Sequence, residues 1–161
     1  MTELAKLAER FLEACKRRQF LVATAESCTG GLMMALLTDI PGASSMVDRG
    51  FVTYSNEAKV EMLGVSQDTL DRHGAVSRQT ALEMAAGALA HSRASIALAV
   101  TGIAGPDGGS AEKPVGLVWF GLAVKGQPPH AEKRQFENRG RDYVRKETVR
   151  TALMLGLDAL A

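Results

Sequence analysis

Apolar residues recur with a helical period near both ends of the chain. Over residues 2–17 they stand three or four positions apart, which predicts an amphipathic helix. A second helix is predicted over residues 141–160, with one apolar stripe made of Val149, Ala152, Leu153, Gly156 and Leu160. Shorter helices are expected over residues 32–37, 58–63, 66–71 and 77–90, and Ser55 or Asn56 can cap the second of these.

Short apolar stretches bounded by turn residues predict strands over residues 20–25, 46–54 and 96–100. Two further strands, 115–124 and 131–136, flank the turn Gly126-Gln127-Pro128-Pro129, which is typical of an antiparallel hairpin. Helices alternate with strands early in the chain, and the hairpin comes late. The pattern indicates an α/β fold, a three-layer α/β/α sandwich with a mixed five-stranded sheet whose last strands form the hairpin.

Length and composition narrow the class of protein. A chain of 161 residues fits one domain, expected over residues 1–161, and 46% hydrophobic with 23% charged residues is typical of globular proteins. Nineteen basic and eighteen acidic side chains leave a formal charge of +1, which gives no general attraction to nucleic acid or to an anionic membrane. No window reaches the roughly 18 apolar residues of a spanning helix, so a soluble, cytoplasmic protein is expected.

The loop after the first strand carries the first candidate chemistry, because ligands in open α/β sheets bind at the carboxyl ends of strands. It reads Ser27-Cys28-Thr29-Gly30-Gly31 and leads into a helix, whose N-terminal N–H groups could bind a phosphate or an oxyanion. The alternative is that Ser27 simply caps the helix. The Walker spacing is missing, and no lysine follows the glycines.

The loop after the second strand contains Tyr54 and leads to Lys59 in the first turn of a helix. A cation there faces the positive end of the helix dipole, which together with partial burial would lower its pKa and allow it to act as a base. The alternatives are a solvated lysine balanced by Glu57 and Glu61, and a Tyr54 that is only a core aromatic.

Two further segments could contact a ligand. Residues 101–109 contain four glycines and one proline after a buried strand, which indicates either a backbone that approaches a ligand or a tight crossover. Basic residues precede and open the last helix. Arg145 lies one turn before Val149 on the apolar stripe, so it is expected to be partly buried and paired with an anion, whereas Arg139 and Lys146 fit a solvated surface.

The inventory of reactive side chains disfavours several classes of hydrolase. His73, His91 and His130 are scattered without paired ligand spacing, which argues against a zinc hydrolase and leaves Ser27 without a natural histidine partner. Cys28 as a nucleophile lacks a histidine partner in the same way. The two cysteines, Cys15 and Cys28, are too few for a disulfide framework. A serine with a lysine as its base is the combination that remains.

Three loops together resemble the CinA C-terminal domain family. They are Ala25-Glu26-Ser27-Cys28-Thr29-Gly30-Gly31, Tyr54-Ser55-Asn56 with Lys59, and Thr101-Gly102-Ile103-Ala104-Gly105-Pro106 followed by Lys113-Pro114-Val115-Gly116. The resemblance covers nearly the whole chain, in order and without a large gap. In longer members the domain follows a separate nucleotide-processing domain, so a stand-alone form is expected here.

The resemblance implies hydrolysis of nicotinamide mononucleotide to nicotinic acid mononucleotide and ammonia, without a metal or cofactor. It implies that Ser27 is the nucleophile and Lys59 the general base, with Tyr54 close by. N–H groups around Gly30 or residues 102–105 would then stabilise the oxyanion. The expected substrate-binding residues are Thr29, Gly30, Gly31, Thr101, Gly102, Ala104, Gly105, Arg141 and Arg145, the two arginines serving the phosphate.

One segment departs from the family pattern, and two other functions stay open. Family members often carry Gly-Asp-Arg where this chain has Arg139-Gly140-Arg141. The alternatives are a noncatalytic nucleotide-binding module, suggested by the family's association with competence and DNA damage, and a hydrolase of a different amide. Aromatic residues make up only 5%, which argues against a nucleic-acid partner, and a homodimer is the default expectation.

Overall fold

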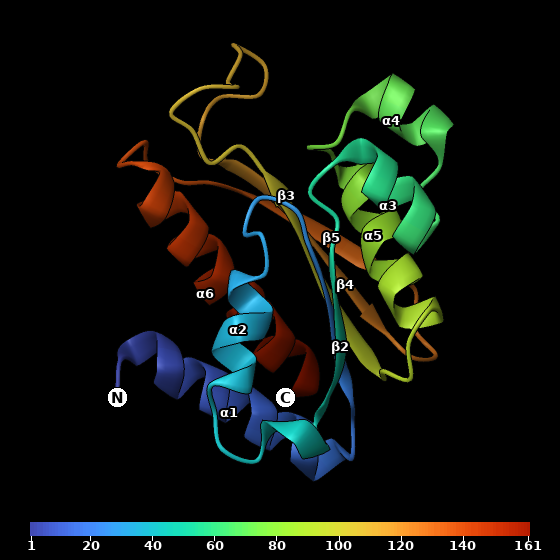
Figure 1. The fold of residues 1–161 in the computed structure, drawn as a ribbon, viewed down its shortest axis with the longest axis vertical. Coiled ribbons are helices and arrows are strands. Elements are labelled where there is room, and N and C mark those ends of the chain that lie inside the picture. Colours follow the sequence, from blue (N-terminus) through green and yellow to red (C-terminus); the bar gives the residue numbers. More distant parts are fainter.

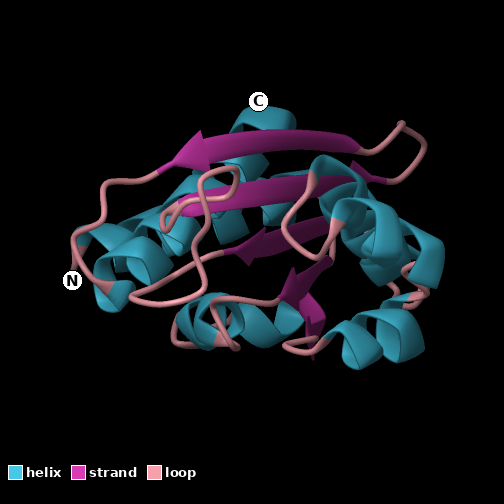
Figure 2. Ribbon diagram, turned by 90° about the horizontal axis from the view of Figure 1, so that it is seen from above, coloured by secondary structure: helices cyan, strands magenta, loops and turns pink.

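The computed structural model describes residues 1–161 as a five-stranded sheet between two layers of helices (Figures 1 and 2). The strand order is β2 (Val47–Val52), β1 (Val22–Glu26), β3 (Ile96–Gly102), β4 (Leu117–Val124) and β5 (His130–Gln135). β1 pairs in parallel with β2 and β3, and β4 pairs antiparallel with β3 and β5. The predicted mixed sheet with a closing hairpin is confirmed.

The helices cover both faces of this sheet (Figure 1). On one face lie α1 (Glu3–Arg18), α2 (Leu32–Thr38) and α6 (Arg141–Leu160), and on the other lie α3 (Asn56–Leu63), α4 (Gln67–His73) and α5 (Arg78–Ala90). A short 3-10 helix, Ala43–Ser45, precedes β2 and was not predicted. None of the helices combines the length and the apolar content that a membrane crossing requires.

Several predicted boundaries are wrong by one or two residues. α3 begins at Asn56 rather than at residue 58, because Ser55 caps it by accepting a hydrogen bond from the Ala58 N–H at 3.0 Å. β1 runs to Glu26 and β3 to Gly102, since pairing with their neighbours continues past the apolar residues. β2 stops at Val52, which leaves Tyr54 in the loop that follows.

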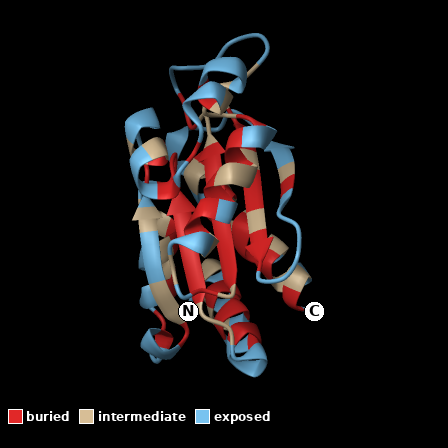
Figure 3. Cartoon of the chain, turned by 90° about the vertical axis from the view of Figure 1, so that its right-hand side faces the viewer, coloured by how far each residue is buried: buried red, intermediate tan, exposed pale blue.

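The two faces of the sheet carry side chains of different size. Large residues such as Ile96, Leu98 and Phe120 pack under α1, α2 and α6, whereas alanines at 23, 25, 97, 99 and 123 face α5. The alternation follows from the two-residue period of a strand and leaves the central strands buried (Figure 3). Small side chains let α5 lie close to the sheet, and a Cβ at Gly121 would collide with the Ala81 carbonyl oxygen.

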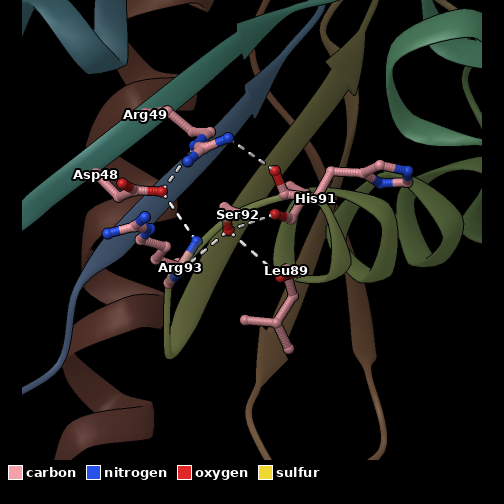
Figure 4. Close-up of polar contacts among 8 residues, drawn as sticks. Asp48, Arg49, Leu89, His91, Ser92 and Arg93 are labelled. Atoms are coloured by element: carbon pink, nitrogen blue, oxygen red, sulfur yellow. Dashed lines mark hydrogen bonds and ion pairs between the residues drawn. The ribbon is translucent and has the colours of Figure 1, made fainter.

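A network of hydrogen bonds joins the edge strand β2 to the loop between α5 and β3, at the end of the sheet where the parallel strands begin (Figure 4). The Asp48 carboxylate accepts bonds from the Arg49 Nε at 2.7 Å and from the Arg93 backbone N–H at 3.0 Å. Arg49 Nη1 donates to the His91 carbonyl at 3.1 Å. The backbone bond from Arg93, supported by Arg49, holds the pKa of Asp48 below its usual range. β2 is thereby tied to the loop between α5 and β3, at the end opposite the candidate site.

The close approach of α5 makes a prediction for Gly121. Gly121→Ala is expected to lower the free energy of unfolding by about 3 kcal/mol, because the atom in the way is backbone and cannot rotate aside. Gly126→Ala is the matched control. It sits in open space with φ +84° and should cost only about 1 kcal/mol of backbone strain. Urea denaturation measures both, and a Gly121→Ala protein as stable as the control would contradict the packing described.

Candidate active site

The end of β1 directs neighbouring side chains to opposite faces of the sheet. Glu26 shares the face of Val22, toward α2, and Ser27 points to the other face, toward α3. Strand pairing continues through Ser27, whose N–H donates to the Val100 carbonyl at 3.0 Å. The direction of the Ser27 side chain is therefore set by the pleat of the central sheet.

The carboxylate of Glu26 caps α2. Its Oε1 accepts bonds from the Thr29 hydroxyl at 2.6 Å and the Met33 N–H at 2.8 Å, and its Oε2 accepts one from the Met34 N–H at 2.9 Å. Glu26 is fully buried, and the N-cap residue, Gly31, has no side chain to do the same work. The alternative that Ser27 caps the helix is wrong, and the N–H groups of the first turn of α2 are already bonded, those of Met33 and Met34 to Glu26 and that of Leu32 to the Thr29 carbonyl.

Lys59 extends from α3 to Ser27 across the sheet end. Its Nζ lies 2.8 Å from Ser27 Oγ, 2.8 Å from the Thr53 carbonyl and 3.5 Å from the Ser55 carbonyl. The side chain is buried, with only 1% of the residue exposed, so the solvated alternative is wrong. Burial lowers the pKa of Lys59 to about 8, because an ammonium loses hydration that two carbonyls and a hydroxyl replace only in part.

A cavity of about 260 Å³, called here the Ser27 pocket, opens beside these two side chains. It is lined by Ser27, Cys28, Tyr54, Asn56, Lys59, Ala75, Val76, Thr101, Gly102, Ala104 and Arg141. All three predicted catalytic positions are among them. Of the predicted binding residues the pocket includes only Thr101, Gly102, Ala104 and Arg141.

Tyr54 and Arg141 join the loops at the mouth of the Ser27 pocket. Tyr54 is 61% exposed, so the core-aromatic alternative is wrong. Its hydroxyl accepts a bond from Arg141 Nη2 at 3.0 Å, and Arg141 Nη1 donates to the Gly105 carbonyl at 2.8 Å. One guanidinium thus connects the segment after β2, the loop after β3 and the start of α6.

Of the other five predicted binding residues, Gly105 accepts the bond from Arg141, and the remaining four shape the first loop rather than line the pocket. Thr29 is buried and bonded to Glu26, and Gly30 and Gly31 have φ of +58° and +106°, which favours glycine. Arg145 donates from Nε to the Cys28 carbonyl at 3.2 Å and from Nη2 to the Thr29 carbonyl at 2.9 Å. The structure therefore pairs Arg145 with carbonyl oxygens, not with the expected anion.

Four residues in or beside the site were given no role there by the sequence analysis. Glu26 could have been found, since a carboxylate that ends a buried strand needs a partner and the nearby α2 has a glycine, which lacks a capping side chain, as its N-cap residue. Nothing in the sequence alone marks the other three as pocket residues, namely Asn56, Ala75 and Val76. Ala75 is held at the site because its carbonyl accepts a hydrogen bond from the Thr101 hydroxyl at 2.9 Å. Burial raises the pKa of Cys28 to about 12, the opposite of an activated thiolate.

Comparison with known proteins decides the family. A model of the CinA C-terminal domain matches residues 4–160. The chain belongs to the CinA C-terminal domain family. It is similar to the nicotinamide-nucleotide amidohydrolase PncC of Escherichia coli strain K12, with 50% identity over 152 residues, 94% of this chain and 92% of the relative. The PncC of Enterobacter agglomerans is 51% identical over 96% of this chain and 93% of its own length.

Solved structures of CinA proteins have the same fold. The competence/damage inducible protein CihA from Agrobacterium tumefaciens superposes with a TM-score of 0.95 at 52% identity, covering 99% of this chain and 96% of that one. A competence damage-inducible protein from Klebsiella pneumoniae gives a TM-score of 0.94 at 37% identity, covering 99% of this chain and 98% of that one.

No three side chains of His, Cys, Asp or Glu lie close enough together in this structure to hold a metal ion.

The α2 cap predicts a stability effect at Glu26. In Glu26→Gln an amide NH₂, itself a donor, would face one of the hydrogen-bond donors that the carboxylate now satisfies. The free energy of unfolding should therefore fall by about 1.5–3 kcal/mol. Glu57→Gln, an exposed carboxylate in the first turn of α3, is the control and should cost about 0.3–1 kcal/mol. Equal losses for both variants in chemical denaturation would show that the buried cap contributes nothing special.

Proposed function

We propose that this chain hydrolyses the carboxamide of nicotinamide mononucleotide to the carboxylate and ammonia, with Ser27 as nucleophile and Lys59 as general base. The observation that carries the proposal is the 2.8 Å contact between Lys59 Nζ and Ser27 Oγ beside a pocket. The names of the PncC relatives supply the nicotinamide nucleotide as substrate. A pKa near 8 leaves an appreciable fraction of Lys59 neutral at physiological pH, as a base requires.

The hydrogen-bond partners of Lys59 suit a neutral amine. A neutral amine has two N–H bonds and one lone pair, and Lys59 Nζ has two carbonyl neighbours and one hydroxyl neighbour. When the two N–H bonds donate to Thr53 and Ser55, the lone pair is left for the Ser27 O–H. The surrounding backbone thus orients the base toward its nucleophile.

The reaction then proceeds through an acyl enzyme. Lys59 takes the Ser27 proton as Oγ forms a bond to the carboxamide carbon, and the carbonyl π electrons move to oxygen. When the tetrahedral intermediate collapses, the C–N bond breaks and Lys59 gives its proton to the departing nitrogen, which leaves as ammonia. A water molecule, deprotonated by Lys59, attacks the ester, and Ser27 recovers the proton as the carboxylic acid is released.

Two N–H groups in the regions expected to stabilise the oxyanion are already bonded elsewhere. The Gly30 N–H already donates to the Ser27 carbonyl at 3.1 Å, and the Ile103 N–H to the Leu117 carbonyl at 2.9 Å. The Cys28 N–H bonds to no other residue, and it directly follows the nucleophile. We assign it as the first oxyanion donor, the arrangement that a nucleophile at a strand-to-helix turn commonly uses.

Removing either member of the pair should abolish turnover. Ser27→Ala and Lys59→Met are each expected to lower kcat for ammonia release from nicotinamide mononucleotide by at least about 10³-fold, because neither remaining group forms the acyl enzyme alone. A coupled ammonia assay measures the effect, with circular dichroism to check folding. Lys125→Met, in the turn between β4 and β5, is the control for loss of a lysine. Full turnover by Ser27→Ala would refute the mechanism.

The pKa of Lys59 predicts the pH dependence of the reaction. The neutral amine is the active form, so kcat/KM should rise with pH, with a midpoint near 8, and level off above it. The unfolded chain keeps its lysine protonated to higher pH, so Lys59 should contribute a rise in the free energy of unfolding between pH 8 and 10.5, the ordinary pKa of a lysine. The buried thiols of Cys15 and Cys28 act in the opposite direction above pH 9, so the contribution of Lys59 is read from the difference between the original protein and Lys59→Met. Lys59→Met should remove that rise in stability, and a rate profile flat from pH 6 to 9 would contradict the assignment.

A further inference from the structure

A second, larger cavity adjoins the Ser27 pocket at the same end of the sheet. Its volume is about 710 Å³, and it lies between the N-terminus of α5, residues 112–114, and the ends of β4 and β5 that face the site. The two cavities share Val76. Ala75 and Val76 line the Ser27 pocket, and the chain continues through Ser77, Arg78 and Gln79 along the wall of the larger cavity.

The walls of this cavity are predominantly cationic, and we call it the cationic pocket. Its charged or titratable side chains are His73, Arg78, Glu112, Lys113, Lys133 and Arg134. Glu112 is the only carboxylate among them, and Arg134 is neutralised by Glu132 at 3.1 Å. No carboxylate pairs with the remaining three permanent cations.

The positions of these three cations are set by neutral partners. Arg78 Nη1 donates to the Ala131 carbonyl at 3.2 Å, and Lys113 Nζ donates to the His73 carbonyl at 2.6 Å. Lys133 Nζ lies 5.9 Å from the centre of the Trp119 ring. Carbonyls and an aromatic face orient a cation without cancelling its charge, so the cationic pocket is prepared for an anion.

The Ser27 pocket is small for a whole nucleotide. Pockets that bury a small organic ligand measure roughly 300–1,000 Å³, and the Ser27 pocket, at about 260 Å³, falls below that range. Of its two cations, Lys59 is bonded to Ser27, and Arg141 is held at the mouth by Tyr54 and Gly105. A substrate whose carboxamide lies at Ser27 has the larger cavity next to it, across Val76.

We propose that the cationic pocket binds the phosphate of the substrate, through Arg78, Lys113 and Lys133, while the carboxamide lies at Ser27. This inference rests on the proposed function. It differs from the expectation from the sequence, in which Arg141 and Arg145 bind the phosphate. It also gives a role to Lys113, a residue of the resembling loops for which the reaction itself has no use.

Two substrates that differ only in the phosphate test the inference. Ammonia release is measured with nicotinamide mononucleotide and with nicotinamide riboside, for Arg78→Gln, Lys113→Gln and Lys133→Gln. Each variant should lower the preference for the mononucleotide, the ratio of the two kcat/KM values, by about tenfold. Lys125→Gln, at the opposite end of β4, is the control and should keep the ratio of the original protein. An unchanged ratio in all three variants would overturn the inference.

A binding measurement separates this inference from the proposed function. Ribose 5-phosphate, titrated calorimetrically, should bind the original protein and the Lys125→Gln control, with a Kd about tenfold weaker in each of the three variants. If no ammonia is released from either substrate, the proposed function is wrong, and this titration alone decides on the phosphate site. Equal Kd values in all proteins would refute it.

Discussion

The pleat of β1 is the constraint on which the rest of the site depends. Because successive side chains of a strand point to opposite faces, Glu26 can enter the layer of α2 only if Ser27 faces α3. The Glu26 carboxylate holds the start of α2 by three hydrogen bonds, so a shift of register would bury an unpartnered charge. The placement of Ser27 beside Lys59 is thus secured by interactions on the other side of the sheet.

The layers of the fold were predictable from periodicity because burial acts on whole elements. The apolar stripe of α6 matches the face that this helix buries, and the continuous apolar strand at 96–100 is buried on both of its faces. The ends of elements were less predictable, since they depend on single contacts. β1 gained Glu26, a residue that looks polar in the sequence but is buried because its partners come from a helix further along the chain.

The residues of the candidate site also differ in how far the sequence alone predicts them. The sequence alone indicates three of the residues that line the pocket, because their reactive groups and their positions after strands can be read from it: Ser27, Lys59 and Tyr54. The partners of Arg145 were not predictable, because a guanidinium near an apolar stripe can meet an anion or a carbonyl, and only the course of the first loop decides. Val76 was beyond sequence reasoning altogether. It is an apolar residue between two cavities, and its importance comes only from where the chain passes.

The three oxygen neighbours of Lys59 Nζ have a consequence for the energy of proton transfer. A charged ammonium has three N–H donors, and it would satisfy Ser27, Thr53 and Ser55 at the distances found. A neutral amine satisfies the same three atoms by reversing only the bond to Ser27. The heavy atoms can keep their places in both protonation states. A proton can therefore cross between oxygen and nitrogen without the reorganisation energy that a mobile lysine in water would require.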